Sequence, residues 1–204
     1  MEPKMMKQLV LASGNAGKLG ELRAMLAGVA LQITAQSEFG VQDVPETGLT
    51  FIENALIKAR HACLMTGFPA LADDSGLIVD ALGGAPGLYS ARYAGTPTDA
   101  AANNAKLLEM LRDVPVGRRS ARFYAVIVLL RHAEDPQPLI ADGCWEGEIV
   151  FEPCGSGGFG YNPIFFDPLY GMTAAQMGAE LKNKISHRAR ALEQLRDCLH
   201  TFMA

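Results

Sequence analysis

Two adjacent carboxylates and a hydroxyl stand between two apolar runs of the chain. Asp73, Asp74 and Ser75 follow the apolar residues 68–71 and precede the apolar residues 77–79. Aspartate is rare in strands, and a charge beside a hydrophobic core costs free energy unless a cation meets it. The pattern therefore favours a divalent metal ion as the partner of these carboxylates. A turn or cap remains an alternative, because Asp pairs are also common in turns.

A loop able to hold an anion is predicted near the start of the chain. It lies between an apolar run and a helical pattern and consists of Ser13, Gly14, Asn15, Ala16, Gly17 and Lys18. Free amides and the dipole at a helix N-terminus attract phosphate, and Lys18 adds a full positive charge. The loop is not a Walker A motif, which would need Gly in place of Ala12 and Ser or Thr in place of Leu19. An ordinary turn with a solvated lysine would have the same composition.

A second glycine-rich loop, residues 155–160, matches the dinucleotide pattern G-x-G-x-x-G by letter. Tyr161, Asn162 and a proline follow it where that pattern requires a helix, so we do not interpret it as a dinucleotide site. We expect instead that the glycines let the backbone approach a ligand, while Phe159 or Tyr161 offers a flat face to a nucleobase. A tight turn with aromatic core residues remains an alternative.

Basic residues surround the start of the last predicted helix: Lys182, Lys184, His187, Arg188 and Arg190. The helix dipole disfavours cations at this end by a few tenths of a kcal/mol each. The cluster therefore favours a negative or electron-rich partner, and a solvated basic face is the alternative.

Composition limits the classes of function. The chain has 204 residues, 49% of them hydrophobic, and a net charge of −4. This acidic balance argues against a general nucleic-acid partner, because such surfaces depend on dense Lys and Arg. No apolar run approaches the roughly 18 residues of a membrane span, so we expect no membrane partner. Four scattered cysteines signal neither a zinc site nor a disulfide framework, and a cytoplasmic location is expected.

Hydrophobic periodicity predicts the elements that position these residues. Strands are predicted at 8–12, 31–35, 77–79, 122–130, 139–142 and 147–151, and helices at 16–27, from the Thr50 to Glu53 capping box, at 98–111 and from Ser186. Residues 81–90 are predicted to be an irregular Gly/Pro loop. The expected fold is one α/β domain over residues 1–204. Its central twisted mixed sheet is flanked by helices, and two lobes enclose an active-site cleft.

Several blocks in the same order give the chain a resemblance to one family. They are the segments 13–18, 46–55, 72–77, 83–87, 90–93, 157–163 and 186–188. Together they resemble the inosine/xanthosine triphosphate pyrophosphatases, which convert ITP, dITP and XTP to the monophosphate and pyrophosphate. Two residues depart from the family's usual pattern: Ser13 stands where Thr is common, and Asn162 where Asp is common. The serine keeps the hydroxyl, whereas the asparagine loses a charge.

The resemblance implies a role for each candidate residue. Asp74 would accept a proton and, with Glu46, hold Mg²⁺, which suits hard oxygen ligands. The triphosphate would be held by Ser13, Gly14, Asn15, Ala16, Gly17, Lys18 and Ser75. The base and nearby groups would be bound by Phe159, Gly160, Tyr161, Asn162, Lys182, His187 and Arg188. A homodimer is also expected from the resemblance.

Two other functions remain open from the sequence. One is a related pyrophosphatase that clears modified pyrimidine or standard nucleotides. The other is a regulatory module that holds a purine without cleaving it, although Asp74 and Glu46 argue against mere holding. Release of pyrophosphate from ITP only in the presence of Mg²⁺ would exclude the second alternative.

Overall fold

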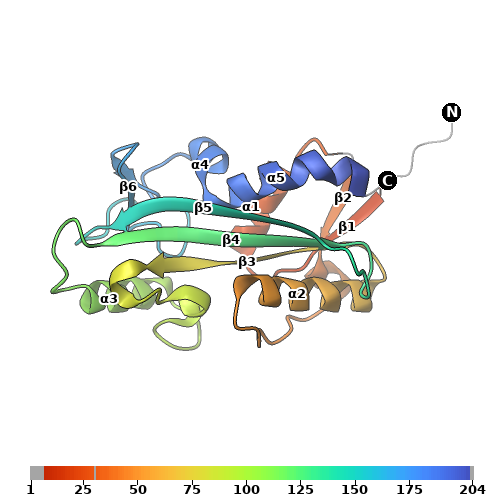
Figure 1. The fold of residues 1–204 in the computed structure, drawn as a ribbon, viewed down its shortest axis with the longest axis horizontal. Helices are drawn as coiled ribbons and strands as arrows, with labels where there is room; N and C mark the ends of the chain where they lie inside the picture. The colour runs from red at the N-terminus through yellow and green to blue at the C-terminus, as the bar shows by residue number, and fades with distance from the viewer. Residues whose placement is uncertain (1–6, 30, 203–204) are drawn as a thin grey trace. The chain divides into compact units, whose positions relative to one another are not determined.

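The computed structural model describes residues 7–29 and 31–202 of the chain. Its described strands form one mixed sheet in the order β2-β1-β3-β4-β5-β6-β7. Figure 1 labels these strands except β7. The strands are β1 (Lys7–Leu11), β2 (Leu31–Ala35), β3 (Ala70–Val79), β4 (Ser120–Leu130), β5 (Leu139–Ile149), β6 (Phe165–Asp167) and β7 (Met172–Thr173). Strand β1 pairs in parallel with β2 and β3, whereas β6 is antiparallel to β5 and β7. The predicted α/β class and mixed sheet are confirmed.

The described helices are α1 (Ala16–Met25), α2 (Phe51–Thr66), α3 (Ala100–Met110), α4 (Ala179–Ile185) and α5 (His187–Phe202). Short 3₁₀ turns occupy Gln36–Phe39, Asp80–Leu82 and Gly87–Arg92. The prediction of α2 from its capping box is confirmed: the Thr50 hydroxyl accepts from the Glu53 amide, and the Glu53 carboxylate accepts from the Leu49 amide. Within the described residues, no helix has the length and apolar content to cross a membrane.

Contacts along the chain divide it into two compact units. The first contains Met1–Asp74, Val126–Asp142 and Ala191–Ala204, and the second contains Ser75–Ala125 and Gly143–Arg190. In the first unit, leucines of α1 and α5 pack with Leu9 and Leu11 of β1 in one apolar cluster. In the second, Phe123, Trp145 and Phe165 form an aromatic cluster, with the indole of Trp145 donating to Asp167 at 2.7 Å.

The structure differs from the predicted elements in four places. The strand predicted at 77–79 begins earlier, at Ala70, and β3 runs through Asp73 and Asp74 without interruption, which excludes the turn that the sequence left open for them. Residues 139–151 form one strand through the buried Trp145 instead of two strands around it. Helix α4, just before α5, was not predicted, and the segment 81–90 contains 3₁₀ turns.

Strand β3 accommodates its carboxylates because of where its neighbour ends. The parallel pairing with β1 stops at Leu11, which lies opposite Leu71. Asp73 and Asp74 therefore extend past the carboxyl end of β1, where the chain leaves the sheet for α1. The crevice beyond such strand ends is the usual place for ligands in α/β folds.

Candidate active site

In the first unit, one lysine joins two of the carboxylates that the sequence singled out. Lys58 of α2 donates to Glu46 Oε1 at 2.8 Å, to Asp74 Oδ1 at 2.7 Å and to the carbonyl of Asp73 at 2.8 Å. The Asp74 side chain is 7% exposed, that of Lys58 13% and that of Glu46 27%. Glu46 and Asp74 thus converge on one cation in a largely buried position. We call Glu46, Lys58, Asp73 and Asp74 the carboxylate cluster.

The local sequence explains how Glu46 reaches this position. Asn54, one helical turn before Lys58 on α2, is buried and accepts a hydrogen bond from the Gly48 amide at 2.8 Å. A Cβ at Gly48 would lie 2.6 Å from the Cβ of Glu53, so only glycine allows the loop to approach the helix this closely. The loop that carries Glu46 is therefore fastened to the helix that carries Lys58.

The second carboxylate of the pair has a different partner. Asp73 is 1% exposed and forms an ion pair of 2.6 Å with Lys18, which stands in the first turn of α1. Before this helix, the Ser13 hydroxyl accepts from the Asn15 amide, and the Asn15 side chain accepts from the Lys18 amide. The predicted anion loop therefore begins a helix as expected, and its lysine is held at the carboxylate cluster.

The two candidate carboxylates titrate differently. Burial raises the pKa of Asp74, although the charge of Lys58 opposes this shift. Burial also opposes ionisation of Glu46, but the charge and hydrogen bond of Lys58 outweigh it and lower the pKa of this carboxyl. When neighbouring groups are shifted apart in this way, the group with the raised pKa is the better proton acceptor near neutral pH.

In the second unit, the start of α5 carries the buried Arg188 and His187. Arg188 is 1% exposed and donates to the hydroxyl of Ser75 at 3.0 Å. The His187 ring stacks on Phe123 with centroids 5.0 Å apart. The Ser186 hydroxyl accepts from the Ala189 amide at 3.3 Å, which confirms its predicted capping role. The expected basic cluster is thus not a solvated face at these two positions.

The glycine-rich loop of the second unit packs against another basic residue. The ammonium of Lys182, whose residue is 7% exposed, lies 5.1 Å from the centroid of the Phe159 ring. A Cβ at Gly158 would meet Asn162 Nδ2 at 1.9 Å and Lys182 Nζ at 3.2 Å. Both nitrogens therefore converge on Gly158. We call Gly158, Phe159, Asn162 and Lys182 the loop cluster.

One amide of the loop cluster is unsatisfied. Asn162 is 4% exposed, and within residues 7–29 and 31–202 its Nδ2 has no hydrogen-bond partner. Asn104 of α3, whose Nδ2 donates to the carbonyl of Gly160 at 3.2 Å, likewise leaves its buried Oδ1 without one. A buried polar group without a partner costs about 1–3 kcal/mol. Such groups are expected where a ligand supplies the missing partner.

Comparisons with known proteins identify the family of the chain. The model of the Ham1 family matches residues 9–198. The chain belongs to the Ham1 family. It is similar to the dITP/XTP pyrophosphatase of Xylella fastidiosa, with 97% identity over 98% of the chain and 100% of that protein. It is 59% identical to the dITP/XTP pyrophosphatase of Escherichia coli O157:H7 over 95% of the chain and 98% of that protein.

Solved structures of Ham1 proteins have the same fold. A HAM1 protein from Coxiella burnetii aligns with a TM-score of 0.89 at 50% identity, covering 96% of this chain and 100% of that one. The Staphylococcus aureus Ham1 protein aligns with a TM-score of 0.84 at 39% identity, covering 96% and 99%.

Not every predicted residue of this Ham1 chain is placed as the sequence suggested. Tyr161 is 4% exposed, belongs to the core and donates its hydroxyl to the carbonyl of Ser90, so of the two aromatic rings only Phe159 presents an exposed face. Burial raises the pKa of Tyr161. Gly155 and Gly157 are required by close packing on the backbone of Ala175, because a Cβ at either would lie under 3 Å from it.

Two charged residues at the site, Lys58 and Asp43, were not predicted from the sequence, and Lys18 was predicted without its partner Asp73. Lys58 joins Glu46 to Asp74, Lys18 pairs with Asp73, and the carboxylate of Asp43 lies so close to Gly14 that a Cβ there would meet it at 2.3 Å. A signal for Lys58 was present: it follows Asn54 by four residues on the face of α2 that buries Ala55 and Ala59.

The donor set of the carboxylate cluster fits a magnesium ion. Within the described residues no group of three or more His, Cys, Asp or Glu side chains is suited to hold a metal. Mg²⁺ does not require such a cage, because it commonly takes one or two carboxylates and completes its shell with water and substrate phosphates. Glu46 and Asp74 offer two hard oxygens that already converge on one cation.

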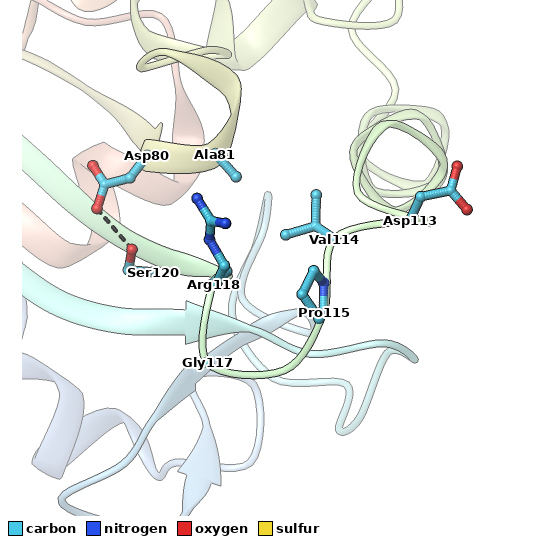
Figure 2. A pocket seen from close by; sticks show the side chains of 8 residues that line it. All are labelled: Asp80, Ala81, Asp113, Val114, Pro115, Gly117, Arg118 and Ser120. Atoms are coloured by element: carbon cyan, nitrogen blue, oxygen red, sulfur yellow. Dashed lines mark hydrogen bonds between the residues drawn. The ribbon is translucent and has the colours of Figure 1, made fainter.

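A pocket in the second unit lies among other residues. It has a volume of about 460 Å³ and is lined by Asp80, Ala81, Asp113, Val114, Pro115, Gly117, Arg118 and Ser120 (Figure 2). Figure 2 shows Ser120 hydrogen-bonded to Asp80, which also pairs with Arg122 at 2.7 Å. None of the predicted site residues lines this pocket, so it is not the candidate active site.

Proposed function

We propose that this chain hydrolyses dITP, XTP and ITP between the α and β phosphates, releasing the nucleoside monophosphate and pyrophosphate. The observation that carries the reaction type is the convergence of Glu46 and Asp74 on one cation, next to a loop suited to an anion. The substrate class is supported by the name of the Xylella fastidiosa relative, which is 97% identical to this chain.

In this proposal the first unit performs the phosphate chemistry. Asp74, with its raised pKa, accepts the proton of the attacking water, while Glu46 stays ionised. Lys18 and the loop 13–17 stabilise the charge of the leaving pyrophosphate. Mg²⁺ held by Glu46 and Asp74 would neutralise phosphate charge.

The loop cluster selects the base. Hypoxanthine and xanthine carry an oxygen at C6, whereas adenine carries an amino group. Nδ2 of Asn162 and Nζ of Lys182 are donors, and Arg188 is a third donor on the same unit. An adenine would leave Nδ2 of Asn162 unpaired, a mismatch worth up to about 10⁴-fold in kcat/KM. We propose that Phe159 stacks on the base.

The test is a substrate profile that identifies the product. The purified chain is incubated with Mg²⁺ and with dITP, ITP, XTP, ATP, GTP or a modified pyrimidine triphosphate, and pyrophosphate is distinguished from orthophosphate. We expect pyrophosphate from the first three substrates and its loss on chelation with EDTA. Tight binding without turnover would support a regulatory module, and release of orthophosphate would overturn the assigned bond.

A homodimeric assembly and a cytoplasmic location are further parts of this proposal. The assembly is carried over from the family resemblance, and the location from the pattern of cysteines. The four cysteines are free in the structure, which supports a reducing compartment. Light scattering at micromolar concentration tests the assembly, and a monomeric mass would contradict it.

A further inference from the structure

Lys58 occupies the point at which the two proposed metal ligands meet. Its ammonium donates to Glu46 Oε1, Asp74 Oδ1 and the Asp73 carbonyl at 2.7–2.8 Å, so all three of its protons are used. Its side chain is 13% exposed, and therefore water does little to screen the two carboxylates from it. An exposed lysine that folded over by chance would not be held at three points.

The charges of the cluster explain why a cation is needed there in the absence of a metal. Glu46, Asp73 and Asp74 carry three negative charges when ionised, and Lys58 with Lys18 returns two positive charges. Without Lys58 the two largely buried carboxylates would lose the ammonium that contacts both of them, and the charge of Lys18 would act on three carboxylates at once, which is unfavourable. The same two oxygens are those that a divalent cation would take, and two cations repel each other at such distances.

We infer that Lys58 is the internal counter-cation of the metal-free site and competes with the divalent cation for Glu46 and Asp74. Binding of the metal then displaces the ammonium from at least one carboxylate. The free enzyme binds the metal weakly as a result, and the triphosphate favours the exchange by offering the released ammonium a new anionic partner. This inference rests on the proposed function, because it takes Glu46 and Asp74 as the metal ligands.

The test measures Mg²⁺ affinity of the nucleotide-free protein by isothermal titration calorimetry. Lys58→Met keeps the length of the side chain and removes its charge. We expect it to bind Mg²⁺ about tenfold more tightly than the wild type, since a repulsive charge is gone. Lys58→Arg retains the charge and should bind as weakly as the wild type. Lys184→Met removes a charge from an exposed pair with Glu180 and controls for net charge.

A second readout reports the exchange without relying on affinity. Lys58→Met should melt at a lower temperature than the wild type in EDTA and gain more in melting temperature on addition of Mg²⁺. In a Glu46→Gln background, where only one of the two carboxylates remains, Lys58→Met should change the melting temperature less. In the wild type without metal, the ammonium protons of Lys58 should exchange slowly with water. The ¹⁵N signal of this ammonium should shift on addition of Mg²⁺ alone.

The outcomes separate this inference from the function beneath it. Equal Mg²⁺ affinity in the wild type and Lys58→Met, or a Lys58 signal that ignores Mg²⁺, overturns the competition and leaves pyrophosphate release from dITP untouched. If Lys58→Met does not fold even with Mg²⁺, the response of the wild-type Lys58 ¹⁵N signal to Mg²⁺ alone tests the competition. If neither Glu46→Gln nor Asp74→Asn changes the Mg²⁺ affinity, these carboxylates are not the metal ligands. The role given to Lys58 then fails as well.

Discussion

In the first unit Lys58 and Lys18 contact the buried carboxylates of the carboxylate cluster, whereas in the second unit Nδ2 of Asn162 in the loop cluster has no partner among the residues that the structure describes. The first region is charged and compensated internally. The second is only partly satisfied, at a cost of about 1–3 kcal/mol for each unpaired group.

This difference corresponds to two kinds of chemical demand. Charge that must be held ready for a reaction is costly to bury, so the chain supplies counter-ions of its own. Recognition depends on donors that only the right ligand can satisfy, and a donor already paired within the protein would not discriminate. We therefore expect substitutions in the first region to affect turnover and those in the second to affect specificity.

The largest expected effect is at Asp74. Asp74→Asn keeps the shape of the side chain and removes the proton acceptor, so kcat for dITP should fall at least about a hundredfold. The measurement is pyrophosphate release under saturating dITP, with circular dichroism to confirm folding. Asp80→Asn is the matched control, because Asp80 follows the same strand but pairs with Arg122. Retained activity in Asp74→Asn would move the proton acceptor to another residue.

The next effect contrasts two buried asparagines of the second unit. Asn162→Leu removes an unpaired donor, so kcat/KM for dITP should fall about tenfold to a hundredfold while the melting temperature stays equal or rises. Asn103→Leu should instead reduce stability, because Asn103 accepts a hydrogen bond from the Ala94 amide at 2.6 Å and donates one to the carbonyl of Ala91. It should lower the free energy of unfolding by about 2 kcal/mol or more.

Thermal melts and dITP kinetics on both variants check this contrast. If Asn162→Leu is as destabilised as Asn103→Leu, the amide of Asn162 has a structural partner and the contrast between the two units fails. Asn162→Asp, which restores the residue common in the family, tests whether an amide or a carboxylate is needed at this position.

Local signals predicted the elements better than the site. The capping box at Thr50 and the apolar run of β4 depend on residues close in sequence, and both were predicted correctly. Continuity of β3 through Asp73 and Asp74 was not, because it depends on Lys18 and Lys58, which come from two helices distant in sequence. Propensity alone disfavours two aspartates in a strand, and tertiary charge compensation overrides it.

The candidate site was predicted residue by residue rather than as an arrangement. Family blocks pointed to Glu46 and Asp74, but no spacing rule joins residues 46, 58 and 74. Similarly, the glycines at 155 and 157 suggested ligand approach, whereas the structure assigns them to packing on Ala175. A glycine signals a close approach without saying what approaches.

A third prediction concerns a carboxylate of the first unit whose role is structural. Asp135 lies in the segment that connects β4 to β5 and is fully buried. Hydrogen bonds from Arg131 outweigh the effect of burial and hold the pKa of its carboxyl well below its usual range. The ionised carboxylate contributes its full stabilisation above the pKa of about 3.9 that Asp has in the unfolded chain. This stabilisation is lost as the pH falls toward the lower pKa of the folded state.

Asp135→Asn should therefore lower the free energy of unfolding by about 1–3 kcal/mol at pH 7 and leave kcat for dITP unchanged. Urea unfolding at pH 7, 5 and 3.5 measures the free energy of unfolding of both proteins. The difference between the wild type and the variant should be smallest at pH 3.5. A difference that stays constant with pH would mean that the charge of Asp135 is not what stabilises this turn. The expected contrast with Asp74 is complete: one carboxylate affects stability, the other turnover.

The smallest expected effect separates the two aromatic residues of the glycine-rich loop. Phe159→Leu removes a half-exposed ring that lies against Lys182, so kcat/KM for dITP should fall about threefold to tenfold with little change in melting temperature. Tyr161→Phe removes the hydroxyl that donates to the carbonyl of Ser90 at 2.8 Å. It should lower the free energy of unfolding by about 1 kcal/mol and leave KM unchanged. If Tyr161→Phe raised KM as much as Phe159→Leu did, the base would contact the buried ring, and the exposed face of Phe159 would not be the stacking surface.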